Sequence, residues 1–119
     1  MPRSPLIHFE LCVNDRPATK AFYADVLGWE ITPTSMPHYD MIATGQAPEG
    51  GLMQKPPAMP RAALNVYFYV DDVAATLAKA TAAGGQVVLP PMDIPNVGTA
   101  GMFQDPEGIV IGVFCPRMA

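Results

Sequence analysis

The sequence contains few of the cysteines and histidines that stabilise small secreted domains through disulfides or small domains through a structural metal ion. It has only two cysteines, Cys12 and Cys115, without CxxC spacing, and only two histidines. This set supports neither a disulfide framework nor a structural zinc site. Two isolated cysteines are typical of free thiols in a reducing compartment. We therefore expect a cytoplasmic protein whose apolar core alone holds it together.

Positive charge is also scarce. Seven Lys and Arg face eleven Asp and Glu, the net charge is −4, and the basic residues are scattered along the chain. This excludes a basic surface for nucleic acid or anionic lipid. No apolar run approaches the length that spans a bilayer, and the opening "MPRSPLIHFE" lacks the apolar segment of a signal peptide. The expected partner is a small molecule.

What the chain does contain is enough apolar sequence for one domain over residues 1–119, since half of its residues are hydrophobic. The fourteen prolines fall mainly outside the apolar runs and are densest in "QKPPAMPRAA", residues 54–63. That segment predicts a linker between two halves. A second Pro- and Gly-rich segment, residues 90–102, has the composition of a loop that could cover a pocket or simply connect two strands.

The two halves repeat each other. "HFELCVND" (8–15) and "NVYFYVDD" (65–72) align at an offset of 57, and "PEG" recurs before the last strand of each half at an offset of 58. Each half reads as strand, helix and three further strands, with Asn14 or Asp15 as the candidate N-cap of the first helix and Asp71 or Asp72 as that of the second. The strand after each helix is expected beside the first strand. The pattern predicts an α+β fold of two βαβββ modules, about 6–55 and 63–115.

This repeat, with "AFYADVLGWEI" after the first strand and "DPEGIVIGVF" at the end, resembles the vicinal oxygen chelate superfamily. That group is also called the glyoxalase, bleomycin resistance protein and extradiol dioxygenase superfamily, and the resemblance covers about residues 6–114. It implies an eight-stranded half-barrel around a ligand cavity, with modules paired within or between chains. Metal-using members hold a divalent ion at four inward positions, which the resemblance places at His8, Gln54, Asn65 and Gly112.

This set of four is a poor metal site. Gln54 and Asn65 are neutral amides and Gly112 has no side chain, whereas a divalent ion needs several good N or O donors. A glycine inside an apolar strand also indicates a bulge, a bend or a close approach. We expect no metal cofactor. The alternative is a metal-dependent lyase, isomerase or dioxygenase rebuilt around His8 and Glu10, which lie about 6.6 Å apart along the strand.

Alternation along the first strand gives it two faces. Phe9, Leu11 and Val13 should lie under the helix, and His8, Glu10 and Cys12 should face the cavity. The fifth strand should likewise send Asn65, Tyr67 and Tyr69 inward. We take His8 and Glu10 as candidate catalytic residues, because an imidazole and a carboxylate can move a proton. The candidate ligand-binding residues are Gln54, Asn65, Tyr67, Tyr69 and Phe114, and Leu52 is expected to line the same cavity.

The fold alone does not choose a reaction. The sequence leaves open an enzyme that moves a proton beside a carbonyl and a binding protein that sequesters its ligand between aromatic rings. The stiff linker favours modules held apart, and so a C2 homodimer whose cavities combine His8 and Gln54 of one chain with Asn65 and Gly112 of the other.

Overall fold

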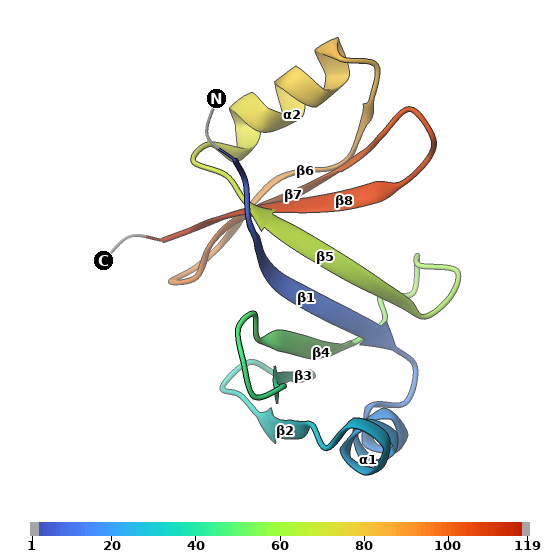
Figure 1. Cartoon of the computed structure of the whole chain (residues 1–119). Helices are drawn as coiled ribbons and strands as arrows, with labels where there is room; N and C mark the ends of the chain where they lie inside the picture. The colour runs from blue at the N-terminus through green and yellow to red at the C-terminus, as the bar shows by residue number, and fades with distance from the viewer. Residues whose placement is uncertain (1–2, 118–119) are drawn as a thin grey trace. The chain divides into compact units, whose positions relative to one another are not determined.

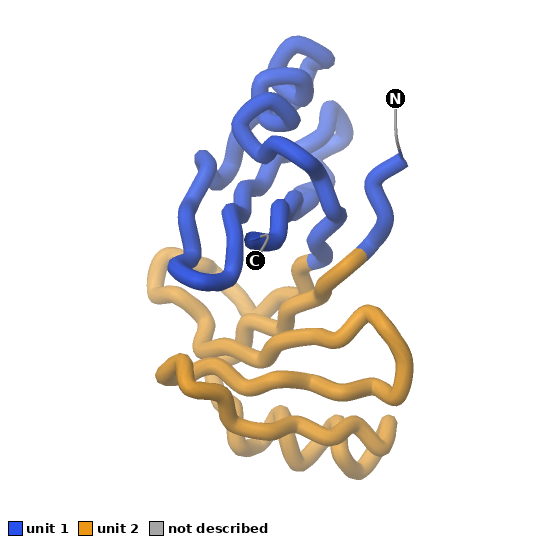
Figure 2. The backbone as a smooth tube through the Cα atoms, turned by 90° about the vertical axis from the view of Figure 1, so that its left-hand side faces the viewer, with its two compact units in different colours: residues 1–6, 66–119 blue, residues 7–65 orange. Residues whose placement is uncertain are grey.

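The computed structural model describes residues 3–117, which form eight strands and two helices in two compact units (Figures 1 and 2). One unit contains residues 7–65, and the other contains residues 66–117 together with residues 3–6. None of the helices in residues 3–117 is long and apolar enough to cross a membrane.

The first unit follows the order strand, helix, three strands. Its elements are β1 (Leu6–Val13, which begins one residue before the unit), α1 (Arg16–Leu27), β2 (Glu30–Pro33), β3 (Tyr39–Ala43) and β4 (Gly50–Gln54). The strand order is β2-β3-β4-β1, in which β4 runs parallel to β1 and antiparallel to β3. The expectation that β2 lies beside β1 is therefore wrong. Two antiparallel connections carry the chain back from β2, so that β4 becomes the partner of β1.

The second unit repeats this topology. Its elements are β5 (Ala63–Tyr69, which begins in the first unit), α2 (Val73–Ala82), β6 (Gln86–Ile94), β7 (Gly98–Gln104) and β8 (Val110–Pro116). The strand order is β5-β8-β7-β6, and β8 runs parallel to β5. The prediction of an α+β fold with two βαβββ modules is confirmed.

The segment 90–102 is part of a strand pair, contrary to the expectation of a loop. Most of it lies in β6 and β7, and the connection between these strands is only residues 95–97. The register of β6 shifts between Leu89 and Met92, at the two prolines. Because β6 is the outer strand of its unit, the missing N–H groups of Pro90 and Pro91 are tolerated there.

Both helices begin as the sequence predicts. A carboxylate oxygen of Asp15 accepts the backbone N–H of Ala18 at 3.0 Å, and Asp72 accepts that of Ala75 at the same distance. These bonds satisfy N–H groups that have no partner within the helix. Gly28 ends α1 in the left-handed conformation, at φ 68°. Both helices therefore start at a residue suited to that position, and α1 also ends at one, whereas the C-cap of α2 is Ala83 at φ −90°.

Each unit has its own apolar core on the helix side of its strands. In the first unit Val13, Ile31, Ile42 and Leu52 are buried, and Phe9, Leu11, Tyr23 and Trp29 pack against them. In the second unit Val70, Val73, Leu77 and Val113 are buried together. The predicted placement of Phe9, Leu11 and Val13 is confirmed. Leu52 is fully buried in this core, so the expectation that it lines a ligand cavity is wrong.

An ion pair ties the start of α1 to the strands. The Nη1 atom of Arg16 donates to Oδ2 of Asp40 at 2.9 Å, and Asp40 is the buried polar residue of the core in the described chain. A buried carboxylate needs such a partner, because removing it leaves an uncompensated charge. Arg16 therefore fixes where α1 begins relative to β3.

Three strand glycines make room for aromatic rings. A Cβ atom at Gly50 would collide with the ring of Phe9, and one at Gly51 with the phenol of Tyr39. At Gly112 an added Cβ would lie 2.5 Å from Cδ1 of Tyr67 and 2.8 Å from the carbonyl oxygen of Val66. Gly112 therefore marks a close approach, and the ring of Tyr67 fills the space where a side chain would stand.

This packing predicts the effect of refilling the position. Gly112→Ala should lower the free energy of unfolding by about 1–3 kcal/mol, since the methyl group overpacks against a ring and a backbone oxygen. Urea unfolding measures the loss. When Tyr67→Ala is already present, Gly112→Ala should cost less stability, because the ring that the added methyl group would meet is gone. Strictly additive losses in the double variant would show that the ring and the glycine do not depend on each other.

Candidate functional site

The polar face of β1 carries a linked trio of side chains. The hydroxyl oxygen of Tyr39 lies 3.0 Å from Nε2 of His8 and 3.1 Å from Oε2 of Glu10. The Nδ1 atom of His8 lies 3.1 Å from the carbonyl oxygen of Glu49. Nε2 of His8 and Oε2 of Glu10 are themselves 4.0 Å apart. The structure therefore brings the two predicted catalytic residues together, through a phenol between them.

Local structure holds Tyr39 in this position. His38 adopts a left-handed backbone, φ 60°, immediately before β3 begins. The hydroxyl of Thr34 donates to the carbonyl oxygen of Tyr39 at 2.7 Å. Gly51, which is paired with Glu10 in the β1–β4 register, leaves room for the phenol above the backbone. The side chain of Tyr39 can therefore reach from β3 across β4 to β1.

Sequence reasoning missed Tyr39. The alternation of "YDMIA" contained a signal, because it separates Tyr39 and Met41 from the core residues Asp40 and Ile42. The strand register was not visible in the sequence, and without it nothing placed Tyr39 near His8. Met41 pairs with Gly51 and so shares the face of Glu10.

Cys12 lies further along the same face and is almost fully buried, at 2% exposure. Burial raises the pKa of its thiol to about 11, and the negative charge of Glu10 adds to this effect. The amide nitrogen of Asn65 donates to Sγ of Cys12 at 3.6 Å, which partly opposes the rise in pKa. The thiol stays protonated near neutral pH and is a poor nucleophile.

The structure does not bring Asn65 or Gln54 to His8. Asn65 contacts Cys12, which lies four residues or about 13 Å along the strand from His8. Gln54 pairs with Val13 and donates to the carbonyl oxygen of Asn14 at 3.0 Å. By that register Gln54 belongs to the helix-side face, opposite His8. Asn65 contacts Cys12 of its own chain, and its place in a site shared with a second chain stays a prediction.

The remaining candidates lie in the second unit. Tyr67 pairs with Gly112 and Tyr69 pairs with Phe114, while their neighbour Val113 faces the core under α2. These three aromatic side chains therefore share the face away from α2, as predicted. The hydroxyl of Tyr69 donates to Asp71 at 2.8 Å, and this hydrogen bond raises the pKa of the phenol.

The donor set does not fit the four-ligand metal centre that the resemblance implies. Within residues 3–117 no three His, Cys, Asp or Glu side chains gather as metal ligands. Gly112 supplies no donor, and Gln54 lies on the other face of its sheet. His8 and Glu10 instead both lie within hydrogen-bond distance of the hydroxyl of Tyr39. The site is therefore built for hydrogen bonds.

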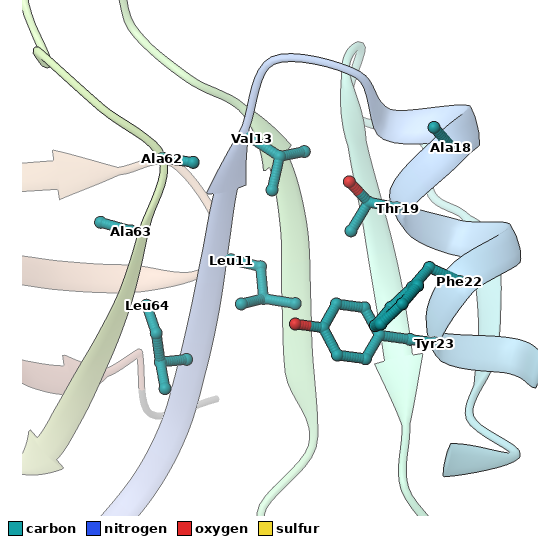
Figure 3. Close-up of a pocket in the computed structure, with 9 residues that line it drawn as sticks. All are labelled: Leu11, Val13, Ala18, Thr19, Phe22, Tyr23, Ala62, Ala63 and Leu64. Carbon is teal, nitrogen blue, oxygen red and sulfur yellow. The ribbon is translucent and has the colours of Figure 1, made fainter. Parts of the chain in front are cut away.

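A separate groove lies on the helix side of the first unit. It has a volume of about 490 Å³ between α1 and the strands, and Phe22 and Tyr23 project into it from the helix (Figure 3). Its lining is mostly apolar and consists of Leu11, Val13, Ala18, Thr19, Phe22, Tyr23, Ala62, Ala63 and Leu64. Since Leu11 and Val13 point away from His8 and Glu10, the groove is distinct from the polar face.

The two thiols should differ in reactivity. At pH 8 a disulfide reagent such as DTNB should modify Cys115 quickly, because it is only partly buried, and Cys12 slowly, because its thiol is buried and protonated. Cys115→Ser should remove the fast phase, and Cys12→Ser should leave it. Two equally fast thiols in the folded protein would show that Cys12 is accessible.

Comparison with known proteins gives relatives for the whole chain. A family model described as Glyoxalase/Bleomycin resistance protein/Dioxygenase superfamily matches residues 6–113. A provisionally named glyoxylase, CFP32 of Mycobacterium tuberculosis, is 42% identical over 117 residues, which cover 93% of this chain and 44% of CFP32. The anthracycline biosynthesis protein DnrV of Streptomyces peucetius is 30% identical over 125 residues, covering 89% of this chain and 45% of DnrV. The chain thus spans less than half the length of these curated relatives.

Solved structures share the fold. The methylmalonyl-CoA epimerase of Mycobacterium tuberculosis aligns with a TM-score of 0.71 at 16% identity, over 96% of this chain and 89% of the epimerase. The Mn(II)-bound glyoxalase of Novosphingobium aromaticivorans aligns with a TM-score of 0.65 at 24% identity, over 98% of this chain and 43% of the glyoxalase. The repeated modules and the family match over residues 6–113 lead to one conclusion: the chain belongs to the Glyoxalase/Bleomycin resistance protein/Dioxygenase superfamily.

Proposed function

We propose that the chain binds a small carbonyl compound on the polar face of β1 and moves a proton on the carbon beside the carbonyl, without a divalent metal. The observation that carries this proposal is the bridge from His8 through Tyr39 to Glu10, with distances of 3.0 and 3.1 Å. An imidazole and a carboxylate at that spacing can serve as acid and base. Family membership supports a small-molecule ligand, and we place the protein in the cytoplasm on the free thiols.

The chemistry requires both removal of a proton and stabilisation of the enolate oxygen that develops. The carboxylate of Glu10 is suited to accept the proton, because only 15% of its side chain is exposed and water competes weakly for it. An N–H of His8 can donate to the developing oxyanion. The residues present therefore cover the roles that a Lewis-acidic metal would otherwise fill.

The name glyoxylase of the 42% identical relative supports a carbonyl substrate. This chain covers 44% of that relative, and we propose that the covered part binds the carbonyl substrate. Pure sequestration, the other function considered for this sequence, would need aromatic surface but no proton transfer. The linked His8, Tyr39 and Glu10 favour the enzyme, since polar groups are costly to bury without a use.

The test is proton exchange on a defined probe. The hemithioacetal formed from methylglyoxal and glutathione, incubated in D2O with the protein, should exchange or transfer its carbon-bound proton, followed by NMR. His8→Ala and Glu10→Gln should each slow this reaction by about 100-fold or more, as expected for loss of a general acid or base. EDTA should not change the wild-type rate.

Two matched variants control for nonspecific effects. His38→Asn removes the other histidine while keeping a residue type that tolerates the left-handed backbone at this position. Glu107→Gln removes an exposed carboxylate in a turn of the second unit. Both should retain the wild-type rate. A rate that EDTA abolishes and a divalent ion restores would instead establish the metal-dependent alternative, and binding of the probe without exchange would favour sequestration.

We further propose that the chain forms a homodimer. Twelve large apolar side chains of the described residues are exposed, among them Phe22, Val26, Leu27 and Leu64. Exposed apolar side chains are stabilised when an interface covers them. Sedimentation equilibrium at micromolar concentration should give twice the 12.7 kDa of the chain, and dilution should lower the thermal midpoint because assembly stabilises the fold. A folded monomer with an unchanged midpoint would contradict the dimer.

A further inference from the structure

The hydrogen bonds around His8 fix one of its protons. A carbonyl oxygen can only accept, so the 3.1 Å contact with Glu49 requires a proton on Nδ1 of His8. The other ring nitrogen, Nε2, then has two options. In neutral histidine it is bare and accepts from the hydroxyl of Tyr39, and in the imidazolium it donates to that hydroxyl.

Tyr39 has one proton to give and two neighbours that could accept it. If His8 is neutral and Glu10 is ionised, the hydroxyl can donate to Nε2 or to the carboxylate, but not to both. One further proton gives both contacts of Tyr39, with His8 and with Glu10, a donor and an acceptor at the same time. Placed on His8, it lets Nε2 donate to the phenol oxygen while the phenol donates to Glu10. Placed on Glu10, it lets the carboxylic acid donate to the phenol oxygen while the phenol donates to Nε2.

We propose that Tyr39 is a positioning residue that carries this one proton between Glu10 and His8, and so resets the pair after each turnover. The inference rests on the proposed function, in which Glu10 and His8 are the base and the acid. The direct separation of 4.0 Å between Nε2 and Oε2 exceeds hydrogen-bond reach, so the two groups cannot exchange the proton without an intermediary. The phenol is within reach of both.

The proton balance closes without an oxidant, a reductant or a metal. Ionised Glu10 accepts the carbon-bound proton of the substrate, and the imidazolium of His8 returns a proton to the same or the neighbouring carbon. The substrate leaves as an isomer, while Glu10 is protonated and His8 is neutral. Glu10 then donates to the oxygen of Tyr39 as the phenol passes its own proton to Nε2, which restores the starting state. The fitting substrate class is a small carbonyl compound with an acidic C–H beside the carbonyl.

The first arm of the test needs no substrate. The chain has two histidines, so His38→Asn leaves a single histidine in a proton-coupled ¹⁵N NMR spectrum. His8 should carry its proton on Nδ1, and Tyr39→Phe should shift the Nε2 resonance, because the bond from the phenol is lost. Tyr69→Phe removes a comparable hydroxyl in the other unit and should change neither nitrogen. A bare Nδ1, or an Nε2 resonance that Tyr39→Phe leaves unmoved, would overturn the proposal.

The second arm uses the hemithioacetal of methylglyoxal and glutathione. Tyr39→Phe should lower kcat at least about tenfold and lower KM in proportion, while kcat/KM and the rate of the first turnover stay unchanged, because only the reset is lost. Added imidazole buffer should restore part of kcat by carrying the proton from outside. Full kcat in Tyr39→Phe would refute the relay while leaving the proposed function intact.

The two ideas fail separately. A wild-type protein inactive on this probe would remove the support for the proposed function, and the NMR arm would still decide the role of Tyr39. If Tyr39→Phe does not fold, Glu10→Met removes the acceptor at the other end of the chain of contacts. The phenol should then donate permanently to Nε2 of neutral His8, and an unchanged His8 spectrum in that variant would equally overturn the relay.

Discussion

The parallel pairing of β1 with β4 is the constraint on which the candidate site depends. This register sets Gly51 beside Glu10 and Leu52 beside Leu11, so one strand contributes a core residue to one face and an open backbone to the other. Because Gly51 has no side chain, the phenol of Tyr39 can cross β4 and reach β1. A one-residue slip of β4 would exchange the two faces, burying Gly51 in the core and filling the passage of Tyr39 with Leu52. The site and the core of this unit thus share one register.

Much of the fold could be predicted from the sequence, because it depends on preferences of residues that are close together in the chain. The repeat at an offset of 57, the aspartate caps and the alternation of β1 each reflect a preference of a few neighbouring residues, and the structure confirms them. The strand order was not readable in the same way. Whether β2 or β4 pairs with β1 depends on contacts between segments about forty residues apart, which no local pattern encodes.

The site was only half readable for the same reason. His8 and Glu10 follow from alternation along one strand, whereas Tyr39 depends on the register of a third strand and on the backbone at His38. Gln54 was misplaced because the sequence repeat aligns it with Gly112 at an offset of 58. The strand register instead makes Gly51 the counterpart of Gly112, since Gly51 pairs with Glu10 and Gly112 with Tyr67, the residue that the repeat aligns with Glu10.

The two modules therefore agree in backbone and differ in chemistry. Each has a glycine at the counterpart position of its parallel strand, and each covers that glycine with a tyrosine ring. In the first module the ring comes from β3 and its hydroxyl joins an imidazole to a carboxylate. In the second module the ring is that of Tyr67 on β5, which the sequence repeat aligns with Glu10. The repeat likewise aligns Asn65 with His8. The first module thus pairs an imidazole with a carboxylate, whereas the second has an amide and a phenol at the corresponding positions. The residues that we propose for proton transfer therefore all belong to the first module.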